Sequence, residues 1–105
     1  MLPIYAETQL IAKALITEAK ANPESPPAKR LARSFAAAAR RDFHVVVGGP
    51  YPELSDRLVH NALLIHRKSG LAGLTVVYVS EVGPSPELAQ AARKVRAKLV
   101  HQELP

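Results

Sequence analysis

A chain of 105 residues has room for one domain built around one hydrophobic core. The absence of cysteine from the sequence excludes disulfides, thiolate catalysis and cysteine-ligated zinc, and it favours a cytoplasmic protein. No stretch reaches the roughly 20 apolar residues that a membrane-spanning helix needs. The low content of Asn and Gln beside frequent Pro is typical of a thermophilic or GC-rich bacterial source.

Residues 5–21 are predicted to form a helix, because apolar residues recur there at helical spacing. The Pro-rich segment 22–27 ends this helix, and Ser25 is a candidate N-cap for a second helix that starts with Pro26 and runs to about Arg41. We expect the two helices to pack as a hairpin against the rest of the domain. The inward stripe expected for the first helix is Leu10, Ile11, Ala14, Leu15 and Ala19.

The second predicted helix is strongly amphipathic and carries the excess charge of the protein. Its basic side chains fall within an arc of about 120° on a helical projection, opposite an apolar face. The segment 28–41 contains no acid, and the rest of the chain holds nine basic and nine acidic residues, so the net charge of +5 belongs to this one segment. Its basic residues are Lys29, Arg30, Arg33, Arg40 and Arg41.

After residue 42 the pattern is β-α-β-α-β. Strands over residues 43–47, 74–79 and 98–102 alternate with helices over 52–69 and 86–96. Alternation of this kind predicts a parallel sheet with right-handed crossovers, and the first two strands, rich in valine, are expected to be buried on both faces. We therefore expect a single α/β domain over residues 1–105. Its core at 43–105 would be a minimal Rossmann-like three-layer domain, with residues 1–42 as a helical-hairpin extension. A sheet of three strands is small, so a homodimer is expected.

Two nearly identical junctions connect these strands to the helices that follow them. They read Gly-Pro-Tyr-Pro-Glu-Leu at 49–54 and Gly-Pro-Ser-Pro-Glu-Leu at 83–88. Pro in the first helical position and Glu in the first turn are favourable for folding alone. If the strands are parallel neighbours, both junctions open onto the edge of the sheet where α/β proteins bind ligands.

This edge is the predicted ligand site. Two helix N-termini there would attract a small anionic or nucleotide-like ligand. However, Glu53 and Glu87 already occupy the positive helix ends, and neither a P-loop nor a Gly-x-Gly-x-x-Gly fingerprint is present. No cofactor is predicted. The residues expected to line the site are Gly48, Gly49, Tyr51, Ser80, Gly83 and Ser85.

The segment 45–49 (Val-Val-Val-Gly-Gly), followed by Tyr51, Asp56, a long helix and the strand 74–79, resembles the YspA-like branch of the SLOG superfamily over residues 43–104. The resemblance implies a small Rossmann-like domain that binds a nucleotide-derived ligand. Here the first strand ends without the Arg of the family's Gly-Ser-Arg turn, and the turn after the second strand keeps one Gly and no Asp. The resemblance thus implies a degenerate ligand site.

Other chemistry has weaker support in the sequence. His44, His60, His66 and His101 have no metal-ligand spacing, so no metal site is predicted. Ser80 and Glu81 lie at a strand end where Asp56 or Glu53 is expected nearby, and a carboxylate pair there would suit acid–base catalysis, but nothing in the pattern requires it. We predict a binding module rather than an enzyme.

Two alternative functions remain open. The five clustered cations of segment 28–41 are typical of nucleic-acid binding as well as of a solvated helix face. Scarcity of aromatic residues argues against a stacking platform for single strands. The other alternative is an interaction protein that dimerises through its helical hairpin.

Overall fold

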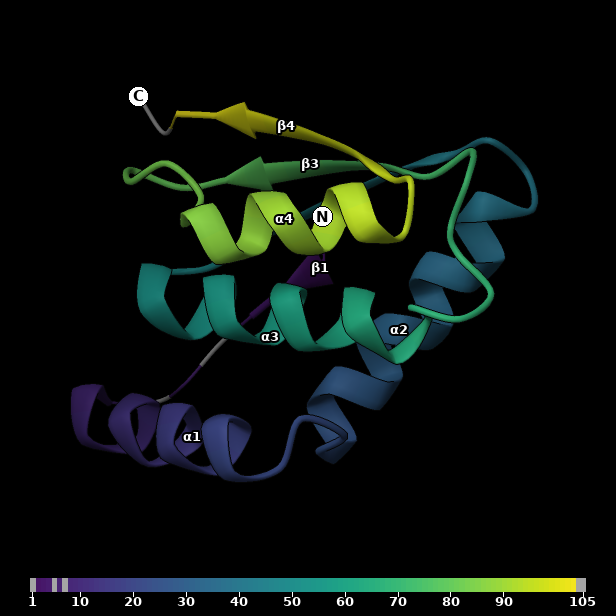
Figure 1. Ribbon diagram of the computed structural model, residues 1–105. Helices are drawn as coiled ribbons and strands as arrows, with labels where there is room; N and C mark the ends of the chain where they lie inside the picture. The colour runs from purple at the N-terminus through teal and green to yellow at the C-terminus, as the bar shows by residue number, and fades with distance from the viewer. Residues whose placement is uncertain (1, 5, 7, 104–105) are drawn as a thin grey trace.

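The computed structural model describes residues 2–4, 6 and 8–103, which form an α/β domain with one parallel sheet (Figure 1). The strands lie in the order β1-β2-β3-β4, and every neighbouring pair is parallel. The three predicted strands and four predicted helices are confirmed, and a short strand at the N-terminus is added to them. The elements are β1 (Leu2–Pro3), α1 (Gln9–Ala21), α2 (Pro26–Ala39), β2 (His44–Gly48), α3 (Pro52–Ile65), β3 (Thr75–Val79), α4 (Pro86–Lys94) and β4 (Lys98–Gln102).

The two faces of the sheet differ sharply in burial. Val45 and Val76 lie in register with Leu99, and this row packs against the helices. Alternate residues point to the opposite face, where Val46 and Val77 are only partly buried and Val100 is 37% exposed. The expected burial of the strands on both faces is therefore wrong for the opposite face.

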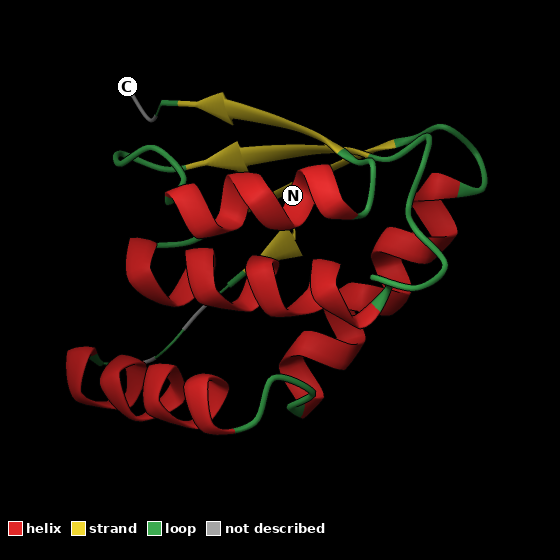
Figure 2. Cartoon of the chain, viewed as in Figure 1, coloured by secondary structure: helices red, strands yellow, loops and turns green. Residues whose placement is uncertain are grey.

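The described helices all lie on one face of the sheet, so the domain has two layers and not the predicted three (Figure 2). The reason is the strand order. Each right-handed crossover advances one strand in the same direction, which returns every helix to the same face. A three-layer Rossmann arrangement needs a reversal of direction within the sheet, and this sheet has none among its four strands.

Strand β1 was not predicted, and it changes how the glycines after β2 are used. The Ile4 amide donates a hydrogen bond of 2.7 Å to the Gly48 carbonyl, which holds β1 against the end of β2. A Cβ atom added to Gly49 would overlap the Ile4 carbonyl oxygen. Gly49 is thus required for the close approach of the N-terminal segment.

Helices α1 and α2 each pack on α3 more than on each other (Figure 1). The amide of Asn61 on α3 donates to the Ala19 carbonyl of α1 at 3.0 Å, and His66 Nε2 lies 2.9 Å from the Ala32 carbonyl of α2. The two helices expected to form a hairpin at 1–42 therefore both pack on α3 and not mainly on each other. No helix among residues 8–103 is long and apolar enough to span a membrane.

The inward face of α1 also differs from the prediction. Ala12 and Ala19 are buried, whereas Leu10 is 78% exposed, Ile11 is 39% exposed and Ala14 is exposed. The apolar face predicted for α2 is confirmed, with Phe35 fully buried, and α4 likewise buries Leu88.

Candidate functional site

A pocket of about 490 Å³ lies at the carboxyl end of β3, between the first turns of α3 and α4. We call it the β3-end pocket. Of the predicted ligand residues, Gly83 and Ser85 line it, and so does Tyr78, which the sequence had not singled out. The structure therefore places a concave surface between the two predicted junctions, with Pro52 and Glu53 from the first and Gly83, Ser85 and Glu87 from the second.

Asp56 connects the two helices that border this pocket. Its Oδ2 atom accepts a hydrogen bond of 2.7 Å from the Ser85 backbone N–H, and its Oδ1 atom accepts one of 2.7 Å from the Ser85 hydroxyl. The Ser85 oxygen in turn accepts from the Leu88 amide at 3.1 Å and so caps α4. Since Asp56 belongs to α3, this chain of bonds ties α3 to the start of α4. Both donors of Ser85 are directed at Asp56 and are not free for a ligand.

Tyr78 contributes a polar group to the lining of the same pocket. Its ring is buried, and its hydroxyl donates to the Pro52 carbonyl at 3.1 Å. Burial, together with the negative charge of Asp56, raises the pKa of Tyr78 to about 12, against the opposing effect of the Ser80 hydroxyl. The phenol therefore stays protonated near neutral pH and acts as a hydrogen-bond donor, not as a base.

The remaining predicted ligand residues have structural partners. Ser80 is buried, and its hydroxyl accepts from the Val82 amide at 3.2 Å. Gly48 and Gly49 lie against Ile4, as described above. Tyr51 occupies the N-cap position of α3 without a side-chain cap bond, and its ring packs against the core. These residues lie outside the lining of the β3-end pocket.

The charges around the β3-end pocket are mixed. Lys20 and Arg57 line it together with three carboxylates, those of Glu53, Asp56 and Glu87. Lys20 Nζ lies 3.7 Å from Glu53 Oε1, and both side chains are largely exposed. The excess of acids agrees with the expectation that the glutamates weaken this edge as a phosphate site.

The strongest charge feature is the exposed side of α2. We call it the α2 basic face and define it by the five predicted cations, all of which are exposed. The helix contains no acid, and the one ion pair found among the described residues is Lys20–Glu53, on other helices. Lys29, Arg30 and Arg33 lie on α2, Arg40 is its C-cap, and Arg41 follows in the turn. From Lys29 to the C-cap the face extends over about 16 Å at the helical rise per residue.

The described residues contain no group of three or more His, Asp or Glu side chains that could hold a metal ion. The carboxylate of Asp56 accepts two hydrogen bonds from Ser85, and Glu81 is exposed. Comparison with protein-family models, curated proteins and solved structures finds no match to this chain, and the SLOG resemblance stays a prediction.

Proposed function

We propose that this protein binds nucleic acid through the α2 basic face. The observation that carries the proposal is the exposure of five cations along α2 and the turn that ends it, without an ion pair to any described acid. An isolated cluster of this kind attracts polyanions, and phosphate contact releases condensed counterions.

The face suits contact with a phosphate backbone more than reading of bases. Arginine and lysine predominate, and the exposed residue between them at position 37 is alanine, which allows close approach of the helix. Helix α2 itself presents no exposed aromatic side chain to stack on a base, because Phe35 is fully buried, and the one exposed aromatic residue next to the face is Phe43, two residues after Arg41. We therefore propose duplex binding with little sequence preference.

The test is binding of a labelled duplex, measured by fluorescence anisotropy over a range of salt concentrations. Each phosphate contact contributes about 0.9 to the slope of log K against log salt. The double variant Arg33→Ala/Arg40→Ala should weaken binding and lower the slope by about 2.

The matched control is Arg93→Ala/Lys94→Ala, which removes two exposed cations from α4. This control should bind nearly as the parent does. Absence of binding at low salt, or equal loss in the control, would show that the α2 basic face is not the site.

A second candidate function is binding of a small nucleotide-like ligand in the β3-end pocket. It is favoured by the position of the pocket at the carboxyl edge of a parallel sheet and by Lys20 and Arg57 in its lining. The Rossmann-like element order and the SLOG resemblance favour the same edge. Because Ser85 already serves Asp56, the cations and not the α4 cap would bind the anionic group.

A thermal-shift screen with nucleotides tests this candidate, since a ligand that binds the folded state raises Tm. The screen would support this candidate if Arg57→Ala abolishes the rise in Tm and Arg67→Ala keeps it. Arg67 is an exposed cation near the other end of α3. A flat screen would count against it.

A further inference from the structure

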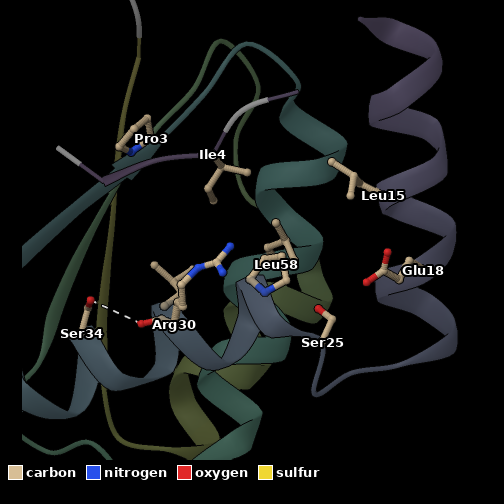
Figure 3. Close-up of a pocket in the computed structure, with 10 residues that line it drawn as sticks. Pro3, Ile4, Leu15, Glu18, Ser25, Arg30, Ser34 and Leu58 are labelled. Atoms are coloured by element: carbon tan, nitrogen blue, oxygen red, sulfur yellow. Dashed lines mark hydrogen bonds between the residues drawn. The ribbon is translucent and has the colours of Figure 1, made fainter. Parts of the chain in front are cut away.

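A second pocket, of about 500 Å³, lies between β1, α1, α2 and α3 (Figure 3). We call it the hairpin pocket. Its apolar walls include Ile4, Leu15 and Leu58, which come from three different parts of the fold. The volume is within the range of small-molecule sites, which are mostly apolar with a few polar groups.

Ser25 gives this pocket an unsatisfied polar group. The side chain is 1% exposed, and its hydroxyl has no hydrogen-bond partner among the described residues. Ser25 occupies the N-cap position of α2 but makes no side-chain cap bond, and Figure 3 shows its hydroxyl turned toward Leu58 and the pocket interior. An orphaned buried hydroxyl costs about 1–3 kcal/mol, so a ligand oxygen here would recover a favourable bond.

Arg30 gives the pocket a charge. Its side chain extends from α2 across the pocket toward Ile4 (Figure 3), and it makes no ion pair with a described acid. Helical side chains lean toward the N-terminus of their helix, which directs Arg30 toward the end where Ser25 lies. Glu18 lies on the opposite wall, on α1. The polar end of a ligand would therefore lie on the α2 side.

We propose that the hairpin pocket binds a small carboxylic acid with an apolar chain. The carboxylate pairs with the Arg30 guanidinium, the Ser25 hydroxyl donates to a ligand oxygen, and the chain lies against Leu15 and Leu58. The pocket is separate from the β3-end pocket, with which it shares no lining residue among those described. Arg30 also belongs to the α2 basic face, so a bound carboxylate would neutralise one of its five cations.

The test compares three probes of equal chain length: octanoate, 1-octanol and octylamine. Octanoate should raise Tm and bind at least about tenfold more tightly than the other two, a difference that corresponds to about 1.4 kcal/mol for the charged contact. Arg30→Gln should reduce octanoate binding to the level of 1-octanol. Equal responses to the three probes would overturn the proposal.

Arg33→Gln is the matched control, because Arg33 lies on the same helix face but does not line the pocket. It should weaken duplex binding and leave octanoate binding unchanged, which separates this proposal from the proposed function. If Arg33→Gln weakens octanoate binding as much as Arg30→Gln does, the pocket is not the site.

The uncovered face of the sheet carries a second inference, independent of the pockets. We call it the open sheet face; at its centre Val46, Val77 and Val100 form a row across β2, β3 and β4. Val100 is 37% exposed, and the other two are not among the residues packed on the core. Parallel sheets are almost always covered on both faces, so this valine row is expected to have a partner.

We infer that a second copy of the chain covers this face with its strands antiparallel to those of the first. Lys98 begins β4 on this face, and Gln102 ends β4 on the same face. A two-fold axis across the strands stacks β4 on β4 in opposite directions and brings Lys98 of each copy near Gln102 of the other, whose side-chain carbonyl can accept a hydrogen bond from the ammonium group. A two-fold axis along the strands would instead place Lys98 near His44, which offers no such carbonyl.

The contact is small. Three strands of five residues give a face of about 14 by 17 Å, well below the roughly 800 Å² per partner of a standard interface. The dimer should therefore dissociate on dilution. Sedimentation velocity over a concentration series measures this directly, and a monomer at every concentration would overturn the inference.

Two variants locate the interface. Val77→Lys should abolish the dimer, whereas Leu10→Lys, at the 78% exposed apolar residue of α1, should not. The opposite result would assign dimerisation to the helical hairpin. Gln102→Lys should weaken the dimer, because it brings two ammonium groups together, and adding Lys98→Glu should restore it. Failure of the charge exchange to restore it would refute the antiparallel arrangement.

Discussion

Replacing Asp56 with alanine tests whether the bond between α3 and α4 holds the β3-end pocket together. Asp56 accepts two hydrogen bonds of 2.7 Å from Ser85, one from the backbone N–H and one from the hydroxyl. Hydrogen bonds to a charged group contribute about 1.5–3 kcal/mol each, but Asp56 is only partly buried, which reduces the net value. Loss of the carboxylate also leaves the Ser85 N–H without its acceptor. We expect a loss of about 2–3 kcal/mol in the free energy of unfolding.

For a domain of this size such a loss lowers Tm by roughly 8–15 °C. Urea unfolding, followed by circular dichroism, measures the free energy of unfolding. An unchanged m-value would show that the variant and the parent expose the same surface on unfolding. Glu87→Ala is the control, because Glu87 is an exposed acid in the first turn of the same helix α4. It should cost no more than about 1 kcal/mol through the helix dipole.

A double-mutant cycle isolates the contact itself. Ser85→Ala removes the α4 cap as well as the donor hydroxyl, so it should cost about 1–2 kcal/mol alone. The double variant Asp56→Ala/Ser85→Ala should cost less than the sum of the two, by about 1 kcal/mol. Strict additivity, or an Asp56→Ala variant within about 0.5 kcal/mol of the parent, would refute the reasoning.

Two further predictions concern Tyr78 and Gly49. The pKa of Tyr78 is raised to about 12 in the folded protein from 10.0, so the stabilisation is fully present below pH 10 and is lost as pH rises toward 12. Because the hydroxyl is only partly buried, denaturant unfolding at pH 9 to 12 should show a loss of roughly 1–2 kcal/mol that Tyr78→Phe largely removes; equal pH dependence of the two proteins would contradict it. Gly49→Ala should displace β1, because the new Cβ would overlap the Ile4 carbonyl oxygen, and hydrogen exchange at the Ile4 amide should then accelerate. An amide as protected as in the parent would show that the segment adapts without loss of pairing.

Much of the fold could be predicted from local sequence patterns. The valine runs that became β2 and β3 and the Pro-Glu starts of α3 and α4 define their elements without tertiary information. Helix α1 shows where such patterns fail. Its apolar residues suit two different faces, and the core selected the one that contains Ala12 and Ala19, which left Leu10 outward.

The site was harder to predict from the sequence, because its contacts join residues that lie far apart in the chain. The hydrogen bonds between Asp56 and Ser85 form only because the starts of α3 and α4 meet at one edge of the sheet. Strand β1 is only two residues long, and the hydrogen bond between Ile4 and Gly48 holds it against β2. A segment this short has no sequence pattern from which a strand could be predicted. Because β1 is not predicted, Gly49 is expected from the sequence to line the ligand site. In the structure, the missing side chain of Gly49 leaves room for the backbone of Ile4 instead.

The strand order β1-β2-β3-β4 links the proposed surfaces to one another. Since the crossovers advance in one direction, the four helices share one face and leave the opposite face of the sheet uncovered. The α2 basic face belongs to the helix layer, and the valine row belongs to the other layer. A dimer formed through the open sheet faces would therefore have a helix layer on each outer side, and each would present its own five cations. Such a dimer would carry two copies of the α2 basic face, an arrangement that suits the bridging of nucleic-acid segments.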